Sequence, residues 1–554
     1  MDPASLALSI LTSYRLCTEG YKVITSMRHA STSALRIQCK CEIEEARFLL
    51  WGKSWGLVDD LSVFRSTPNV HLKLVKEPVA ISHLVAKILS EIENILGNAT
   101  GLKKKYGLSD LLRTESANEE DASEEPAPEP NYTGSMNLKK RISWSTRDKS
   151  SFEELVADLR ELNNGLYSLV PIKSQSLLTE ALNAEILPAK DRPRDLEILK
   201  EVSEQADPQL SDAVELKLLG LKANSCETTW NANPSVKLPK AGFRFQTPDG
   251  LSEHSDNLAS SSMSYAFFTP KGTDTGVPVL IEWKPYDPRA TGSRAFVIAL
   301  RAEGLCRLLE KFSSTSLSVP SCLGFFDDVD GGRFGFAFPL PQTPLYGGLL
   351  QPANLNDLIS GQPALPPLED RFKLASTLAR TLFAFHCSEW LHKDFSSHNI
   401  LLGTLPGNNS SADLTQPFVV GFTYSRPEDH EGVSSEIRQT QSLKHLLYQH
   451  PSLLHHSTPI APRYCKAFDL WSLGCVLLEI GLWRRLKDLW KPKYAENPTA
   501  WTDRLRNVWV GELRGRCGGQ YEHVVTRCLS ASEQDFESSA LFWEIIGKLE
   551  ELRV

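Results

Sequence analysis

The pattern of apolar and polar positions divides the chain into a helical first part and a mixed second part. Up to about residue 225, apolar residues recur every three or four positions, which is the period of an amphipathic helix. The stripes cover residues 35–50, 81–92, 151–169 and 195–219. Asp2 and Pro3 predict a further helix at the N-terminus, and a Ser-Phe-Glu-Glu capping box predicts that the third helix begins at Ser151. Successive amphipathic helices predict an α-helical bundle.

A charged stretch interrupts this bundle between the second and third stripes. Residues 103–105 and 139–141 are basic clusters, and the run between them is acidic and contains proline. Low hydrophobicity and dense like charge predict a disordered loop over about residues 107–137. We interpret this loop as a solvated linker; the alternative is that its basic ends contact anionic lipid.

From about residue 240, strand-like and helix-like segments alternate. Apolar runs predict strands at 277–284, 334–340 and 418–423, the last after a polar insertion at 403–417. Amphipathic patterns predict helices at 293–311 and 368–386. The second part is therefore expected to be an α+β domain.

The composition excludes several classes of function. A chain of 554 residues is too long for one core, so about three units are expected. The net charge of −8 argues against a nucleic-acid partner. Eleven cysteines are scattered and follow no secretory signal, which indicates reduced thiols and a cytoplasmic protein. The closest pair, Cys39 and Cys41, falls on a predicted helix and is interpreted as core packing rather than a zinc site.

Two tryptophan motifs connect the first part to a known family. Residues 51–57 read Trp-Gly-Lys-Ser-Trp-Gly-Leu, and residues 141–149 read Arg-Ile-Ser-Trp-Ser-Thr-Arg-Asp-Lys. Together with the apolar N-terminal helix, they resemble the fungal HeLo (prion-inhibition and propagation) domain over about residues 1–222. The resemblance implies a helical bundle that acts in heterokaryon incompatibility and cell death. No amyloid-forming tail is evident, because the chain ends in a helical pattern.

The same resemblance implies that the N-terminal helix inserts in membranes when the protein is activated. The apolar run ends near residue 11, ahead of Arg15, and is shorter than the ~18–20 residues of a membrane span. Membrane or partner contact would fall on its apolar side chains, which are Leu6, Leu8, Ile10 and Leu11.

Residues 391–399 carry the main chemical signal. They read Leu-His-Lys-Asp-Phe-Ser-Ser-His-Asn and precede an apolar strand. This spacing resembles the protein-kinase catalytic loop, H-R-D-x-x-x-x-N. The resemblance implies that Asp394 accepts the proton of an attacking hydroxyl group, while Asn399 faces a metal ion on the nucleotide phosphates.

Further segments follow in the order that a kinase requires. The strand at 277–284 ends in Lys284, which resembles the lysine that binds the phosphates of ATP. That lysine pairs with a glutamate on the next helix, for which Glu303 is the candidate. Residues 469–474 read Asp-Leu-Trp-Ser-Leu-Gly and resemble a large-lobe motif whose aspartate, here Asp469, caps the backbone of the catalytic loop.

The expected fold class is therefore multidomain, with a HeLo-like α-helical bundle followed by an α+β, bilobal protein-kinase-like domain. The expected boundaries are 1–225 for the bundle, 226–239 for a linker, 240–345 for the small lobe and 346–554 for the large lobe.

Three departures from the kinase pattern bear on catalysis. Gly421 stands where a kinase has the aspartate of Asp-Phe-Gly, which holds the bridging metal ion, so magnesium binding would rest on Asn399 alone. Ser396 stands where serine/threonine kinases have a lysine that contacts the γ-phosphate. The segment 257–265 has serines in place of a glycine-rich loop, and without glycines the backbone approaches phosphates less closely.

The favoured interpretation is a signalling switch in which a pseudokinase, able to bind ATP, controls the bundle. Protein partners are expected, together with relocation from the cytoplasm to a membrane on activation. Two alternatives stay open. One is an active serine/threonine kinase that uses ATP and magnesium through Asp394 and Asn399, and the other is a scaffold that binds no nucleotide.

Overall fold

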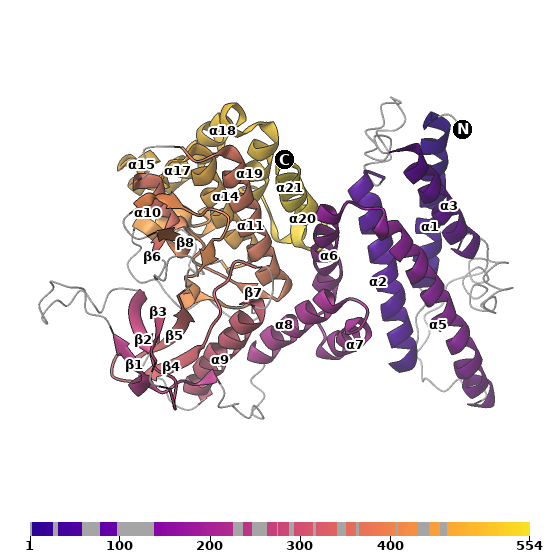
Figure 1. The fold of residues 1–554 in the computed structure, drawn as a ribbon, viewed down its shortest axis with the longest axis horizontal. Helices are drawn as coiled ribbons and strands as arrows, with labels where there is room; N and C mark the ends of the chain where they lie inside the picture. The colour runs from indigo at the N-terminus through magenta and orange to yellow at the C-terminus, as the bar shows by residue number, and fades with distance from the viewer. Residues whose placement is uncertain are drawn as a thin grey trace, which may run out of the picture. The chain divides into compact units, whose positions relative to one another are not determined.

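We describe the fold from a computed structural model. The structure describes residues 3–25, 32–57, 78–96, 138–224, 236–245, 263–273, 275–286, 293–313, 317–340, 351–361, 365–405, 408–428, 443–454 and 462–553. The chain divides into two compact units, Met1–Asp212 and Ala213–Val554. Figure 1 labels their elements along the chain. The acidic loop expected at about 107–137 lies outside the described residues.

The regular elements in the described part of the first unit are helices, so the predicted bundle is confirmed as a helical region. They are α1 (Pro3–Thr25), α2 (Thr32–Trp55), α3 (Val79–Leu96), α5 (Leu138–Ser168), α6 (Ile172–Ile186), η3 (Leu187–Ala189), α7 (Pro193–Ser203) and the start of α8 (Pro208–Asn224). Helix α1 begins at Pro3, as predicted, and buries one face at a spacing of three and four residues. Cys39 and Cys41 lie on α2 and are buried, which confirms their core role.

Two predicted boundaries in this unit are wrong. Helix α5 begins at Leu138, so Ser151 lies inside the helix and does not cap it. A Ser-x-x-Glu pair caps a helix only where the preceding backbone is not helical, and the lysine- and arginine-rich run before it continues the helix well. The fourth stripe is two helices, because Pro208 cannot continue α7 and instead starts α8.

A buried charge network joins the helices of the bundle. Glu44 on α2 is fully buried, and its carboxylate accepts hydrogen bonds from Arg160 at 2.8 Å and Arg47 at 3.1 Å. The amide of Asn163 donates to the same carboxylate at 2.9 Å, and Tyr21 of α1 donates to Asn163 at 3.4 Å. A buried carboxylate needs such partners to remain charged.

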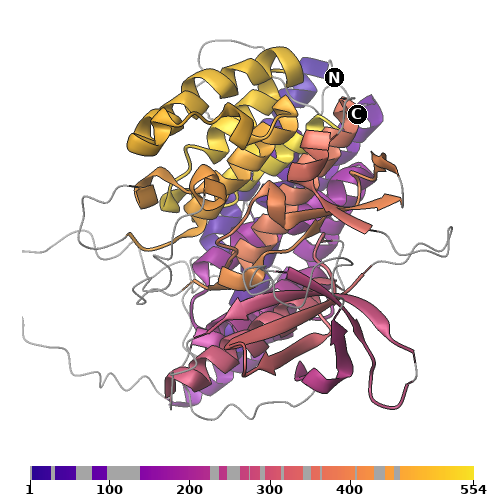
Figure 2. The same ribbon diagram turned by 90° about the vertical axis from the view of Figure 1, so that its left-hand side faces the viewer.

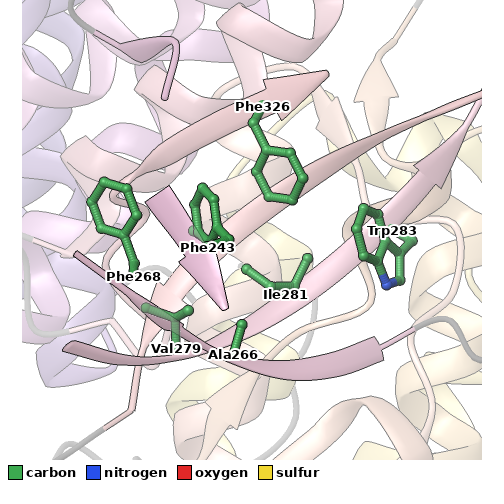
Figure 3. Packing of buried hydrophobic residues seen from close by; sticks show 8 residues of the cluster. Phe243, Ala266, Phe268, Val279, Ile281, Trp283 and Phe326 are labelled. Carbon is green, nitrogen blue, oxygen red and sulfur yellow. The ribbon is translucent and has the colours of Figure 1, made fainter. Parts of the chain in front are cut away.

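The second unit opens with a curled antiparallel sheet in the order β1-β2-β3-β5-β4. Its strands are β1 (Phe243–Phe245), β2 (Met263–Phe268), β3 (Val277–Pro285), β4 (Gly324–Asp328) and β5 (Arg333–Pro339), and α9 (Ser293–Ser313) follows β3. One face of the sheet carries a core of buried aromatic and aliphatic side chains, among them Ile281 and Trp283 of β3 (Figure 3). Since side chains alternate along a strand, Glu282 and Lys284 lie on the opposite face.

The rest of the second unit is mostly helical (Figure 2). Its strands are β6 (Gln351–Asn354), β7 (Trp390–Leu391), β8 (Ile400–Leu405), β9 (Asn408–Ala412), β10 (Phe418–Val419) and β11 (Arg426–Pro427); β8 pairs with β10, β6 and β9 in a four-stranded sheet, and β11 pairs with β7 in a two-stranded sheet. Its longer helices are α11 (Leu368–Cys387), α14 (Lys466–Leu482), α18 (Val510–Cys517) and α19 (Gly519–Cys528). Shorter helices are α10 (Leu355–Gly361), α12 (Leu443–Tyr448), α13 (Pro451–Leu454), α15 (Leu486–Leu489), α16 (Lys493–Glu496), α17 (Pro498–Arg504), α20 (Ala540–Phe542) and α21 (Lys548–Glu551).

Most of the predicted elements of this unit are confirmed, and two are wrong. The strands at 277–284 and 334–340 and the helices at 293–311 and 368–386 match β3, β5, α9 and α11. The strand expected at 418–423 ends after Val419, because Gly421 adopts a left-handed conformation and a 3₁₀ turn follows. The polar insertion at 403–417 contains strand β9, which pairs with β8.

Candidate functional site

The loop at 391–399 is fixed by a buried aspartate from α14. Asp469 is fully buried and accepts hydrogen bonds from the backbone N–H of His392 at 2.7 Å and of Lys393 at 2.8 Å. The Tyr464 hydroxyl donates to the same carboxylate at 2.8 Å. Burial alone would raise the pKa of Asp469, but the hydrogen bond and charge of His386 outweigh it and the pKa is lowered. The predicted capping role of Asp469 is confirmed.

The first residues of the loop are held by their own backbone and ring contacts. Lys393 has a positive φ of 69°, which is costly for a residue with a side chain, and its bond to Asp469 stabilises that conformation. The ring of His392 is buried and lies 3.1 Å from the carbonyl oxygen of Val420. Burial lowers the pKa of His392, so the ring is neutral at pH 7. These contacts give the loop a fixed position beside the segment that leads to Gly421.

Asp394 and Asn399 come together as the motif predicted. The Asn399 side-chain amide donates to the backbone oxygen of Asp394 at 2.7 Å and to its carboxylate at 2.9 Å. The Asp394 side chain is 15% exposed and lies 3.8 Å from the His445 ring. The carboxylate thus keeps some access to solvent, while Asn399 is almost fully buried and already bonded within the loop.

Gly421 occupies the position of the metal-binding aspartate in the kinase motif Asp-Phe-Gly. Its backbone is left-handed, with φ 93° and ψ 37°, and a Cβ there would overlap the Asn399 amide and lie 2.8 Å from the Asn399 Cβ. The Gly421 N–H donates to the carboxylate of Glu282 at 2.9 Å. An aspartate therefore does not fit at 421 in this conformation.

Strand β3 contributes two charged side chains to the same place. Lys284 donates hydrogen bonds to the carbonyl oxygens of Thr423 and Ser425. Glu282, two positions earlier on the same face, is 1% exposed and accepts from the Thr423 hydroxyl at 3.2 Å as well as from Gly421. Burial raises the pKa of Glu282 to about 7. Both side chains thus bind the turn at 421–425.

Glu282 is not among the site residues predicted from the sequence, although its position carries a signal. A carboxylate within the run Val-Leu-Ile-Glu-Trp-Lys at 279–284 is out of place in a buried strand unless it has partners. The expected pairing of Lys284 with Glu303 stays a prediction. Glu303 is buried on α9 and forms an ion pair with Arg307 at 2.7 Å.

A second buried network lies behind the loop. Ser397 is bonded to the Tyr448 hydroxyl at 2.7 Å, and Tyr448 donates to Glu479 of α14 at 2.9 Å. Burial raises the pKa of Glu479 to about 7. Ser396 is buried as well, so the position where a kinase has a phosphate-binding lysine faces the interior. Ser396 and Ser397 therefore contribute to the packing of the loop against the interior.

The residues present do not fit a magnesium ion that bridges nucleotide phosphates. Gly421 has no ligand to offer, and the Asn399 amide is bonded to Asp394. Within the described part of the chain, no group of three or more His, Cys, Asp and Glu side chains is arranged to hold a metal ion. Lys284 and Asn399 both contact the turn at 421–425.

The candidate membrane residues divide into buried and exposed positions on α1. Leu6 and Ile10 are 3% and 1% exposed, whereas Leu8 is 66% exposed and Leu11 is half-buried. Leu6 and Ile10 could therefore reach a membrane only if α1 left the bundle. Among the described residues, no helix combines the length and apolar character that a membrane span requires.

Comparison with known families finds two separate matches, one in each part of the chain. Residues 4–204 match the family model of HeLo, described as prion-inhibition and propagation. The first part of the chain is HeLo-like. Residues 324–550 match a domain of unknown function (DUF7580), which includes the 391–399 loop and Gly421 but begins after β3. No curated protein matches the chain. The HeLo resemblance is thus confirmed, and the kinase resemblance stays a prediction.

Proposed function

We propose that this protein is a switch in fungal incompatibility or cell-death signalling. The C-terminal unit holds the HeLo-like bundle inactive, and a signal from a protein partner releases α1 to act at a membrane. The HeLo match supports the pathway. The burial of Leu6 and Ile10 supports a helix on which these two apolar residues become available only on release, whereas Leu8 is already exposed.

The C-terminal unit acts in this proposal as a kinase-like regulatory domain without phosphoryl transfer. The observation that carries it is the turn at 421–425, which binds both Lys284 and Glu282 and has Gly421, without a carboxylate, against Asn399. Transfer of a phosphoryl group depends on cations that neutralise charge on the phosphates. Glu282 would instead add negative charge at this place if it ionises.

Liposome leakage tests the membrane role. Residues 1–225 should release dye from anionic liposomes, and Leu8→Glu should reduce the release about tenfold or more, because a charge inside a bilayer costs ~2.5–3.5 kcal/mol. Leu84→Glu is the matched control, since Leu84 is an exposed leucine on α3. Equal release by all three proteins, or by none of them, would contradict the membrane role. Ile10→Glu is unsuitable, because Ile10 is core.

An active kinase is the second candidate, because Asp394 and Asn399 are bonded to each other at the motif spacing. Thermal shift of the full chain with ATP, with and without magnesium, separates the possibilities. A shift without magnesium fits a pseudokinase that binds ATP, and a shift that needs magnesium favours the enzyme. No shift with either favours a scaffold. Radiolabelled phosphate transfer that disappears in Asp394→Ala would establish the kinase.

A further inference from the structure

A lysine on α8 is completely buried inside the second unit. Lys217 has no exposed side-chain surface, and its ammonium group lies 3.2 Å from the carboxylate of Glu389. Lysine is rarely buried to this extent unless it is paired. Residues of α8 from Ala213 onward belong to the same compact unit as Glu389. The pair therefore attaches the second half of this helix to the C-terminal unit.

Lys217 joins a cluster of buried charges. Lys466, at the start of α14, lies 2.9 Å from Glu389 and 3.3 Å from Glu428. Arg463 lies 3.8 Å from Glu428. Burial would raise the pKa of Glu389, but the charges of Lys466 and Lys217 outweigh it and lower that pKa to about 2. Glu389 is therefore a carboxylate at every physiological pH, and it attracts Lys217 throughout.

The cluster sits at the two strands that frame the candidate site. Glu389 immediately precedes β7 and the loop at 391–399, and Glu428 immediately follows β11. The two residues are also joined through the backbone, since the Glu428 N–H donates to the Glu389 carbonyl at 2.7 Å. Strands β7 and β11 pair with each other. A change in the turn at 421–425 would thus reach Lys217 through Glu428 and Glu389.

Helix α8 is anchored at both of its ends, and the boundary between the units falls within it. Just before it, Asp207 pairs with Arg160 of the bundle at 2.8 Å. Further along, Gly220 lies so close to the turn before β7 that a Cβ there would be 2.8 Å from the Ser388 carbonyl oxygen. The helix is thus continuous across the boundary between the units.

We propose that α8 is the helix through which the C-terminal unit restrains the HeLo-like bundle, and that the pairing of Lys217 with Glu389 is the lock. This inference rests on the proposed function and names its regulatory contact. Without Lys217, Glu389 keeps Lys466 as a partner, so the cluster tolerates the release of α8 without leaving a carboxylate buried alone. The locked and released states can therefore both be populated.

The test uses the full chain with Lys217→Met, which keeps the length of the side chain and removes its charge. Hydrogen exchange of the α8 amides should become about tenfold faster, because a methionine at this position cannot form the ion pair that holds α8 to Glu389. Dye release from liposomes should rise in parallel. Lys311→Met is the matched control. Lys311 pairs with Glu215 of the same helix at 3.2 Å, but both side chains are about a third exposed, so its exchange and dye release should stay within twofold of wild type.

Glu389→Gln provides a second variant, which acts from the other partner in case Lys217→Met fails to fold. Unchanged α8 exchange in the folded variants, or an equal change in Lys311→Met, overturns the lock. A second outcome is that exchange becomes faster in the full-chain variants but dye release does not rise, although residues 1–225 alone release dye. That outcome overturns the control of the bundle by the pairing of Lys217 with Glu389. If residues 1–225 release no dye, the proposed function fails instead, and the exchange result still decides whether Lys217 holds α8.

Discussion

Replacement of Gly421 by alanine probes the geometry of the candidate site with the smallest possible change. Two independent penalties apply. The backbone at 421 has φ 93°, which L-residues rarely adopt, and the new Cβ would lie 2.8 Å from the Cβ of Asn399. Asn399 cannot move away easily, because it is buried and its amide makes two hydrogen bonds to Asp394.

The two penalties can be estimated separately. A left-handed conformation costs a non-glycine residue roughly 1–2 kcal/mol. A methyl group forced into a packed interior costs a further 1–3 kcal/mol. Gly421→Ala should therefore destabilise the C-terminal unit by about 3 kcal/mol. Gly272→Ala isolates the first penalty, because Gly272 has φ 89° and a Cβ there would meet nothing within 4 Å.

The assay is chemical denaturation of the full chain, following the transition of the C-terminal unit. We expect a loss of about 3 kcal/mol for Gly421→Ala and about 1 kcal/mol for Gly272→Ala, by the two penalties above. Equal losses of unfolding free energy in the two variants would refute the argument that Asn399 leaves no room for a side chain at position 421. Gly421→Asp, which restores the aspartate of the kinase motif, should likewise lose stability and gain no response to ATP with magnesium.

Two further predictions concern buried carboxylates. Glu44→Gln should lower the stability of the bundle, measured by thermal melting, by roughly 3 kcal/mol, because it breaks a buried network; Glu201→Gln, which breaks an exposed pair with Arg36, should cost less than about 1 kcal/mol. For Glu282, the folded pKa of about 7 lies above the ordinary 4.5, so the folded protein retains a proton that the unfolded chain releases. The resulting stability is present below pH 4.5 and is lost as the pH rises to about 7. Glu282→Gln should therefore weaken the pH dependence of the melting temperature of the C-terminal unit between pH 4.5 and 7, while the part due to Glu479 remains. An unchanged pH profile would contradict the raised pKa of Glu282.

The sequence predicted the long elements well because their periodicity is set by burial. Helices α2, α9 and α11 and strand β3 each repeat apolar residues over several turns or pleats, and the pattern is strong enough to place them. The errors arose where a short local signal was used alone. The capping box at Ser151 is compatible with a helix interior, and the position of Pro208 decides a boundary that the hydrophobic stripe runs through.

Only the part of the candidate site that belongs to the kinase-like motifs could be predicted from the sequence. The spacing of Asp394 and Asn399 and the capping role of Asp469 could be inferred from the sequence, because each depends on a short loop or a known neighbour. The contacts of Glu282 with Gly421 and Thr423 join residues that are 139 and 141 positions apart. No local pattern encodes such a pairing, so the interaction became visible only in the folded chain.

The residues that match the kinase motif and those that depart from it fall into two physical classes. Those that match make hydrogen bonds inside the protein: Asp469 to the loop backbone, Asn399 to Asp394, and Lys284 to the carbonyl of Thr423. Gly421 and Ser396 depart from it, at the positions where a kinase would contact metal and phosphate. Each of the three matching residues thus has a structural task within the protein. We therefore place the proposed signal of this unit in α8 and its lysine rather than in Asp394.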